Sequence, residues 1–428
     1  MTAVPAPGLH AVASPVRSGA PAHRTTLPDV VEYVFAGAVL LFLSEALLGP
    51  LFNPLQLEDG APWLRQLWLP VYALTALAAL MRLPDMVRVF WGGVLLAPLL
   101  LLAGLSQQWS IAPDITIRRT IALSFTGLFS LYLAARFSWR QLLNLLAAVF
   151  LVLAVGSYIS VLVAPGWAVH ATIHPGAWKA LWFEKNGLGQ IMTWGVLACA
   201  SAALLTPARR PLWMFAALLC AGLVLFSTSK TSLLGLMLVA GGLTGVAGLR
   251  RGGLLAVATL WLGLTAAALA VAVAVFAPEL ILDALGKDPT LTGRTDIWAS
   301  VLRRVEEHPW QGYGYGAFWA VEEGPVGYVR SEVNWEAPTA HNGWLELLLS
   351  FGWTGVLLFA VHLTVTAAAA LTSLGRGAHA YWAVLAVAVF VLFSASESNI
   401  LQQNNLIWCL YVLTSAKLLL VRAPEPPR

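Results

Sequence analysis

Long apolar runs alternate with short polar interruptions along almost the whole chain. Most runs come close to the roughly 20 residues that an α-helix needs to cross the hydrocarbon layer of a bilayer. The pattern predicts an all-α protein with about twelve transmembrane helices. Their expected ranges are 30–49, 66–82, 88–106, 119–135, 141–163, 187–206, 211–227, 231–248, 253–277, 341–367, 379–397 and 402–421.

Composition supports a membrane location. Of the 428 residues, 59% are hydrophobic and 11% are charged, whereas a soluble domain carries about 25% charged residues. The three cysteines lie inside apolar runs, so they predict neither a disulfide framework nor a zinc cluster. We expect an integral membrane protein that has membrane lipids among its partners.

Lys and Arg in the short loops set the expected orientation. The pairs Arg209–Arg210 and Arg250–Arg251 occupy tight turns that are typical of cytoplasmic anchors, and most other arginines fall on the same side. Both termini then lie in the cytoplasm. The resulting parts are a disordered cytoplasmic tail at 1–28, nine helices at 29–277, a large external loop at 278–340, three helices at 341–421 and a cytoplasmic tail at 422–428.

The external loop concentrates charges, aromatic residues and glycines. Residues 293–308 are expected to form a helix with one apolar face, and Pro309 is expected to end it. The Gly-Tyr alternation at 312–316 predicts a turn. The apolar face comprises Ile297, Val301, Leu302 and Val305. Tryptophans near the loop suit either the headgroup region or a platform for sugar rings, and both interpretations stay open: Trp178, Trp182, Trp310, Trp319, Trp335 and Trp344.

The sequence contains no G-x-x-x-x-G-K-[ST] loop, and no predicted cytoplasmic loop is long enough for a nucleotide-binding domain. Energy must therefore come from the substrate or from a gradient. Two classes of protein remain: a transferase that uses an activated, lipid-linked donor, and a secondary transporter or flippase for an anionic lipid or solute. The polar residues gather at the external face and no inverted repeat is evident, which favours the transferase.

Several cations are predicted at one membrane depth on the external side, where they do not help orientation and are costly to bury alone. Acidic neighbours such as Asp296, Glu306 and Glu307 offer an ordinary pairing for any single one of them. Several helix-terminal cations around one loop are more typical of a pyrophosphate site. The residues are Arg118, Arg119, Lys185, Lys230 and Arg294.

His341 stands where the loop re-enters the membrane, at the predicted start of a helix. The positive end of the helix dipole favours neutral imidazole, the form that acts as a general base. Asn342 and Glu346 are four residues apart, so they share a helix face and are candidates to orient a hydroxyl or the imidazole. The alternative is a histidine that only caps the helix. His170, His174 and His308 are expected to be solvated or capping, and Glu45 and Glu397 to make structural hydrogen bonds.

The order of short motifs resembles the O-antigen ligase and polymerase family of bacterial envelope enzymes. The motifs are Lys185-Asn186-Gly187, Ser229-Lys230-Thr231, Arg294-Thr295-Asp296-Ile297-Trp298, His308-Pro309 with Gly312-Tyr313-Gly314, His341-Asn342 with Leu345-Glu346, and Gly352 with Gly355. The resemblance covers roughly residues 180–360 by motif. It implies a GT-C-like glycosyltransferase in the inner membrane with a periplasmic active site and an undecaprenyl pyrophosphate-linked glycan as donor.

Within that family, the acceptor is lipid A–core oligosaccharide for ligases, another lipid-linked glycan for polymerases, and a protein for a third branch. The length of this chain and its loop are similar to those of the ligases. His341 would take the acceptor proton and Arg294 and Lys230, with Arg118, Arg119 and Lys185, would hold the phosphates in a single inverting displacement. No acidic cluster marks a metal site, so we expect metal independence, no cofactor, and neither nucleotide nor nucleic acid as partner.

Overall fold

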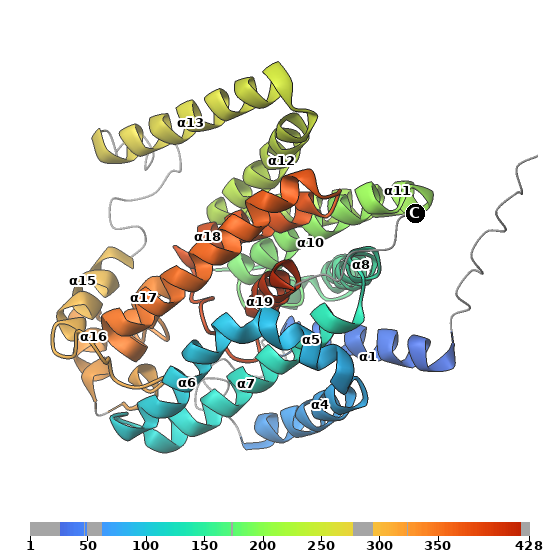
Figure 1. Cartoon of the computed structure of the whole chain (residues 1–428). Coiled ribbons are helices and arrows are strands. Elements are labelled where there is room, and N and C mark those ends of the chain that lie inside the picture. The colour runs from blue at the N-terminus through green and yellow to red at the C-terminus, as the bar shows by residue number, and fades with distance from the viewer. Residues whose placement is uncertain are drawn as a thin grey trace, which may run out of the picture.

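The computed structural model describes residues 26–46, 48, 62–172, 174–276, 294–322 and 324–420, and the side chains of 62–65 and 267–276 are not described. These residues are almost entirely helical, which confirms the all-α class (Figure 1). The α-helices are α1 (Leu27–Leu43), α4 (Pro62–Met81), α5 (Leu83–Gly93), α6 (Ala97–Leu105), α7 (Pro113–Arg136), α8 (Trp139–Val163), α9 (Pro165–Ala168), α10 (Lys185–Leu205), α11 (Arg210–Phe226), α12 (Lys230–Arg251), α13 (Gly253–Phe276), α15 (Arg294–Val305), α16 (Pro325–Val333), α17 (Gly343–Thr372), α18 (Ala380–Ser394) and α19 (Leu406–Leu419).

Every apolar run singled out in the sequence overlaps one of these helices. In the part of the chain that the structure describes, six helices are long and apolar enough to cross a membrane: Leu83–Gln108, Trp139–Val163, Lys185–Leu205, Pro207–Phe226, Lys230–Arg251 and Gly343–Gly375. The chain is therefore a multi-pass membrane protein by length and composition, while twelve spans and the orientation stay predictions. The expected tail at 1–28 and the start of the external loop at 278 fall largely outside the described residues.

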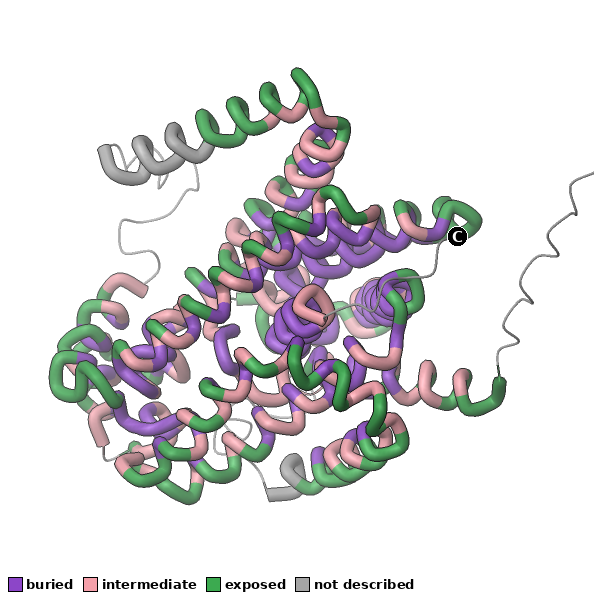
Figure 2. Tube along the Cα trace, in the orientation of Figure 1, coloured by how far each residue is buried: buried purple, intermediate pink, exposed green. Residues whose placement is uncertain are grey.

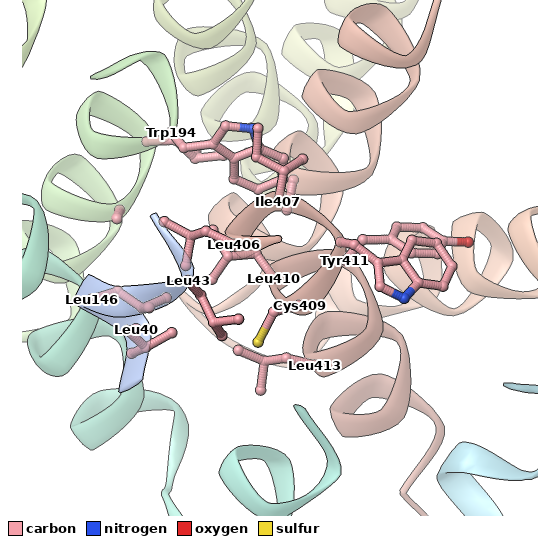
Figure 3. Packing of buried hydrophobic residues seen from close by; sticks show 14 of the residues in the cluster. Leu40, Leu43, Leu146, Trp194, Leu406, Ile407, Cys409, Leu410, Tyr411 and Leu413 are labelled. Carbon is pink, nitrogen blue, oxygen red and sulfur yellow. The ribbon is translucent and has the colours of Figure 1, made fainter. Parts of the chain in front are cut away.

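The centre of the bundle is α19, which buries every residue from Leu406 to Ala416 (Figure 2). It packs against α5, α7, α17 and α18. Figure 3 shows its leucines meeting Leu40 and Leu43 of α1 and Leu146 of α8. The sequence prediction began this helix at 402, but it begins at Leu406, and α18 ends at Ser394 rather than at 397. The residues between them form a polar connection.

From Arg294 on, the described part of the predicted external loop is a small folded unit rather than a bare connection. It contains α15, α16 and the 3-10 turn Phe318–Ala320, and it packs on the first part of α17 (Figure 1). The helix expected at 293–308 is α15, which ends at Val305, before Pro309. Its face is as predicted except for Leu302, which is 47% exposed; Ser300 is buried in its place. A second hydrophobic cluster, around Ile297 and Val329, closes this unit against α17.

A break in α17 anchors the loop to the membrane helices. Gly352 has φ +61° and interrupts the helix, and the segment 308–316 fills the gap. The Trp353 N–H donates to the Pro309 carbonyl at 2.7 Å, and the Tyr313 N–H donates to the Leu349 carbonyl at 2.7 Å. A Cβ at Gly312 would lie 2.5 Å from the Leu349 oxygen. This close approach explains the predicted turn: only glycine fits there.

The other edge of the same segment is held by the turn before α7. The Ile111 N–H donates to the Tyr313 carbonyl at 3.1 Å. The Tyr315 N–H donates to Ser106 Oγ at 3.0 Å, and Thr116 donates to the Tyr315 carbonyl at 3.0 Å. The Gly-Tyr segment therefore joins the N-terminal helices to α17 and fixes the loop between them.

Candidate active site

A cavity of about 1640 Å³ opens between the folded loop and the ends of α1, α4, α7 and α10. Residues of α4 and α7 give the lining apolar side chains, among them Trp68, Leu69 and Ile121. Another wall comes from α16 and its C-terminal turn and carries polar residues such as Arg330 and Asn334. Pockets for small ligands have volumes of about 300–1,000 Å³, so this cavity has room for a larger amphipathic molecule.

His341 lies beside the cavity in a group with a carboxylate and a guanidinium. Its Nδ1 is 3.6 Å from Glu397 Oε2, and Glu397 Oε1 is 3.3 Å from an Arg294 nitrogen. Arg294 also donates to the Ser396 carbonyl at 2.6 Å. The three side chains are 17–25% exposed. Two residues singled out in the sequence, Arg294 and His341, are thus brought together, and Glu397, expected to make a structural hydrogen bond, joins them.

His341 is held in an uncommon backbone conformation. It precedes the N-cap of α17 and has φ +48°, a value that a non-glycine residue adopts only at some cost. Asn342 is the N-cap, and its Oδ1 accepts from the Trp344 and Leu345 N–H groups. Trp335 of the loop stacks on the imidazole with the ring planes 5° apart. The surrounding contacts therefore set both the position and the plane of the ring.

Glu346 fixes the turn that carries His341. Its Oε1 accepts from the Ala340 N–H at 2.7 Å and from Ser398 Oγ at 3.3 Å, and its Oε2 accepts from the Trp319 indole at 3.0 Å. It shares a helix face with Asn342, as expected, but these bonds go to the loop and to Ser398 rather than to the imidazole. Glu346 also lines the cavity.

Two helices begin with a lysine at the same end of the bundle. Lys185 is the first residue of α10 and Lys230 the first of α12, and their charges interact repulsively. The two helices approach each other closely at Gly189, where a Cβ would lie 2.5 Å from Ser232 Oγ. Helix N-termini and lysines both favour an anion. Asn186 follows Lys185 in the first turn of α10.

The remaining predicted cations lie on α7. Arg118 and Arg119 both line the cavity, and Arg119 donates to the Gly316 carbonyl at 2.7 Å. Arg294, Lys230, Lys185 and His341 are not part of that lining. Residues close to them in the sequence or in space, Glu184, Thr339 and Ser398, do line the cavity. The structure thus separates the predicted cations into a pair inside the cavity and a group at its edge.

Glu184 connects this edge with the short segment before α10. It interacts electrostatically with His341 and Glu397, and desolvation raises its pKa. His170 Nε2 lies 3.6 Å from Glu184 Oε2, and the His170 side chain is 9% exposed. Of the two expectations for this residue, solvated or capping, the structure excludes the solvated one. Burial, Lys179, His174 and Lys185 lower the pKa of His170.

Comparison with known proteins identifies part of the chain directly. Residues 215–360 match the family model described as O-Antigen ligase. Residues 215–360 are therefore similar to the O-antigen ligase family, and we refer to this matched range as the O-antigen ligase domain. It is also 33% identical over 198 residues to the exopolysaccharide production protein ExoQ of Rhizobium meliloti (strain 1021), a match that covers 42% of this chain and 43% of that protein. Both findings support the O-antigen ligase and polymerase family.

The O-antigen ligase domain contains Lys230, Arg294, His341, Asn342 and Glu346. Outside its matched range lie the α7 arginines, Lys185 with Asn186, and the α18–α19 connection. The domain therefore holds the histidine and the loop, while other helices complete the surroundings.

The α18–α19 connection is the part of the site that sequence reasoning missed. It was assigned to two spans, yet it supplies Glu397 to His341, Ser398 to Glu346 and Leu401 to Tyr315. Its polarity offered the signal. Residues 394–405 read Ser-Ala-Ser-Glu-Ser-Asn-Ile-Leu-Gln-Gln-Asn-Asn, a polar run between two apolar helices.

Proposed function

We propose that this protein transfers a glycan from undecaprenyl pyrophosphate to an acceptor hydroxyl at the periplasmic face of the inner membrane. The observation that carries the proposal is the group of His341, Glu397 and Arg294 at the edge of a large cavity that is lined in part by apolar residues. The apolar part of the lining suits a polyprenyl chain, and the lysines at the starts of α10 and α12 suit a pyrophosphate. The O-antigen ligase domain supports the same chemistry.

In the proposed reaction, the Glu397 carboxylate faces Nδ1 of His341 and favours the tautomer with hydrogen on Nδ1. Nε2 is then free to take the proton of the acceptor hydroxyl as that oxygen attacks the anomeric carbon. The new C–O bond forms while the bond from the anomeric carbon to the pyrophosphate oxygen breaks, with inversion. The 3.6 Å separation of His341 and Glu397 is typical of a site without substrate, because such contacts tighten on binding.

Charge neutralisation accounts for the leaving group. Pyrophosphate departs with its bonding electron pair, and cations that are already in place stabilise that charge without rearrangement. Lys185, Lys230 and Arg294 are the residues we propose for this role, with Arg118 and Arg119 acting from within the cavity. No nucleotide is needed, since the donor is already activated.

Two acceptors remain candidates. The sequence favours lipid A–core oligosaccharide, the acceptor of O-antigen ligases. The similarity to a protein named for exopolysaccharide production favours a second lipid-linked glycan, as in a polymerase. Both use the same donor chemistry and the same base, so the proposal concerns the transfer and leaves the choice of acceptor to experiment.

The test is transfer by the purified full chain in detergent or nanodiscs, with lipid-linked glycan as donor and either rough lipopolysaccharide or a second lipid-linked glycan as acceptor. A glycosidic product with one acceptor supports the proposal and identifies the branch. Movement of the lipid-linked glycan across liposomes, with no product from either acceptor, would instead support a flippase.

A further inference from the structure

The α18–α19 connection contributes three consecutive amide side chains to the cavity, Gln402, Gln403 and Asn404. We propose that this amide row recognises the hydroxyl groups of the donor's saccharide and that Gln402 sets selectivity among sugars. The inference rests on the proposed function and adds to it which residues recognise the sugar of the donor.

The backbone of the row is strained and firmly held. Leu401 has φ +54°, in the left-handed region that most non-glycine residues avoid, and Asn404 has φ +55°, a value that asparagine adopts more readily. The Tyr315 hydroxyl donates to the Leu401 carbonyl at 2.5 Å, and the Asn404 N–H donates to Thr126 Oγ1 at 2.9 Å. Strain of this kind persists only where surrounding contacts enforce it, and it concentrates at ligand sites.

The contacts of the three amides differ. Tyr72 donates to Asn404 Oδ1 at 2.9 Å, which leaves the Asn404 amino group as a donor, and the Tyr315 hydroxyl lies 3.0 Å from Gln403 Oε1. Both side chains are thus tied to the tyrosines beside them. Gln402 lines the cavity between them and Leu401, half-buried. Gln402 is therefore the amide best placed to form hydrogen bonds with a ligand.

The chemistry of the amide row itself fits a sugar rather than a phosphate. Amides are neutral and offer both donors and acceptors, which match hydroxyl groups. The wall formed by α16 and its C-terminal turn adds Ser331, Asn334 and the Trp335 ring, and Trp319 lines the same space. Phosphate would be drawn to the cations instead. The α18–α19 connection therefore has two proposed roles. Glu397 contacts the base His341, and the amide row, a few residues later, binds the saccharide.

The test measures binding, so it does not depend on the acceptor. The full chain in detergent is titrated with synthetic polyprenyl pyrophosphates that carry glucose, galactose, N-acetylglucosamine or no sugar. We expect Gln402→Ala to weaken the best glycosylated ligand about tenfold, as the loss of one or two neutral hydrogen bonds would. The lipids that carry the other sugars should lose less affinity, so the ratio of affinities between the best sugar and the others becomes smaller. Gln402→Met, which keeps a similar length but removes both hydrogen-bonding groups and adds no charge, should behave similarly.

Two controls separate this effect from a general defect. Gln107→Ala alters an exposed glutamine in the turn before α7 that does not line the cavity, and it should leave all affinities unchanged. The sugar-free polyprenyl pyrophosphate should bind the Gln402 variants within about twofold of the wild type, because the inference places phosphate elsewhere.

The inference fails if both Gln402 variants keep the wild-type affinities and preference, or if they weaken the sugar-free lipid as much as the glycosylated ones. The proposed function fails separately, if the wild type binds no polyprenyl pyrophosphate of the panel. Equal binding of glycosylated and sugar-free lipids by the wild type would remove the saccharide subsite and leave the pyrophosphate proposal standing.

Discussion

Glu397 Oε2 lies 3.6 Å from His341 Nδ1, while its other oxygen pairs with Arg294. One carboxylate thus faces both residues that the sequence placed at opposite ends of the external loop. We expect Glu397→Gln to lower kcat about 10- to 100-fold, because the amide no longer stabilises the imidazolium that forms in the transition state. The pH profile of kcat separates this role from a structural one, since loss of the carboxylate should shift its acid limb. An unchanged profile with full activity would remove Glu397 from the mechanism.

Arg294 donates to the Ser396 carbonyl and to Glu397 through two different nitrogens. Lysine cannot make both bonds at fixed geometry, so we expect Arg294→Lys to lose nearly as much activity as Arg294→Ala. Arg303→Lys is the matched control, because Arg303 is half-exposed and pairs with Glu332 on the outer side of the loop. Wild-type turnover in Arg294→Lys would show that this position needs only a positive charge and not the two hydrogen bonds of a guanidinium.

The helices of the bundle were predictable because their signal is local. Apolar runs long enough to span a bilayer leave few alternatives to a helix, and α15 was visible from its periodic face. The arrangement of the site was less accessible. The sequence singled out Arg294 and His341 as residues of one loop, but the partner that both contact, Glu397, follows α18 and reaches them only through the tertiary fold.

The same limit explains the errors at 379–397 and 402–421. Hydropathy averaged over a window hides a polar connection of about a dozen residues between two apolar helices. His170 was expected to be solvated or capping, and its position in a loop does not reveal which other segments cover it. Its burial beside Glu184 depends on α10 and on the turn between Val169 and Trp178.

Gly312 and Gly352 should be sensitive to a single added methyl group. Both have positive φ, and a Cβ at either would collide with the backbone of the facing segment. We expect Gly312→Ala to cost about 1–3 kcal/mol from backbone strain alone. Thermal unfolding in detergent should show a lower Tm. Gly375→Ala is the control, since a Cβ there meets no atom within 4 Å. Equal Tm values for the two variants would contradict the proposed anchoring of the loop.

His170 predicts a pH-dependent stability. Its folded-state pKa is lowered from 6.5, mainly by burial, so the unfolded chain takes up a proton that the folded chain resists. Its contribution to stability is present above about pH 6.5 and is lost as the pH falls below that value. The Tm of the wild type should therefore drop between about pH 7.5 and pH 5.5, and His170→Gln should drop less. His308→Gln, at an exposed position, should follow the wild type. A larger drop in Tm for His170→Gln than for the wild type would contradict the assignment of this pH dependence to His170.

Metal independence remains a prediction, and adding a chelator tests it. Among the described residues, no group of three His, Cys, Asp or Glu side chains is arranged to hold a metal ion. We expect glycan transfer to continue in excess EDTA at an unchanged rate. Loss of activity that only Mg²⁺ or Mn²⁺ restores would overturn this expectation and would require a metal in place of part of the cationic group.

The central claim is that His341 removes the acceptor proton in a glycan transfer from a lipid pyrophosphate. The most direct measurement is single-turnover transfer from a labelled lipid-linked glycan by the wild type and by His341→Ala at equal occupancy of donor. We predict a glycosidic product with the wild type and a loss of about 10²–10⁴-fold in rate for His341→Ala, with donor affinity retained. Transfer at the wild-type rate by His341→Ala would contradict the account.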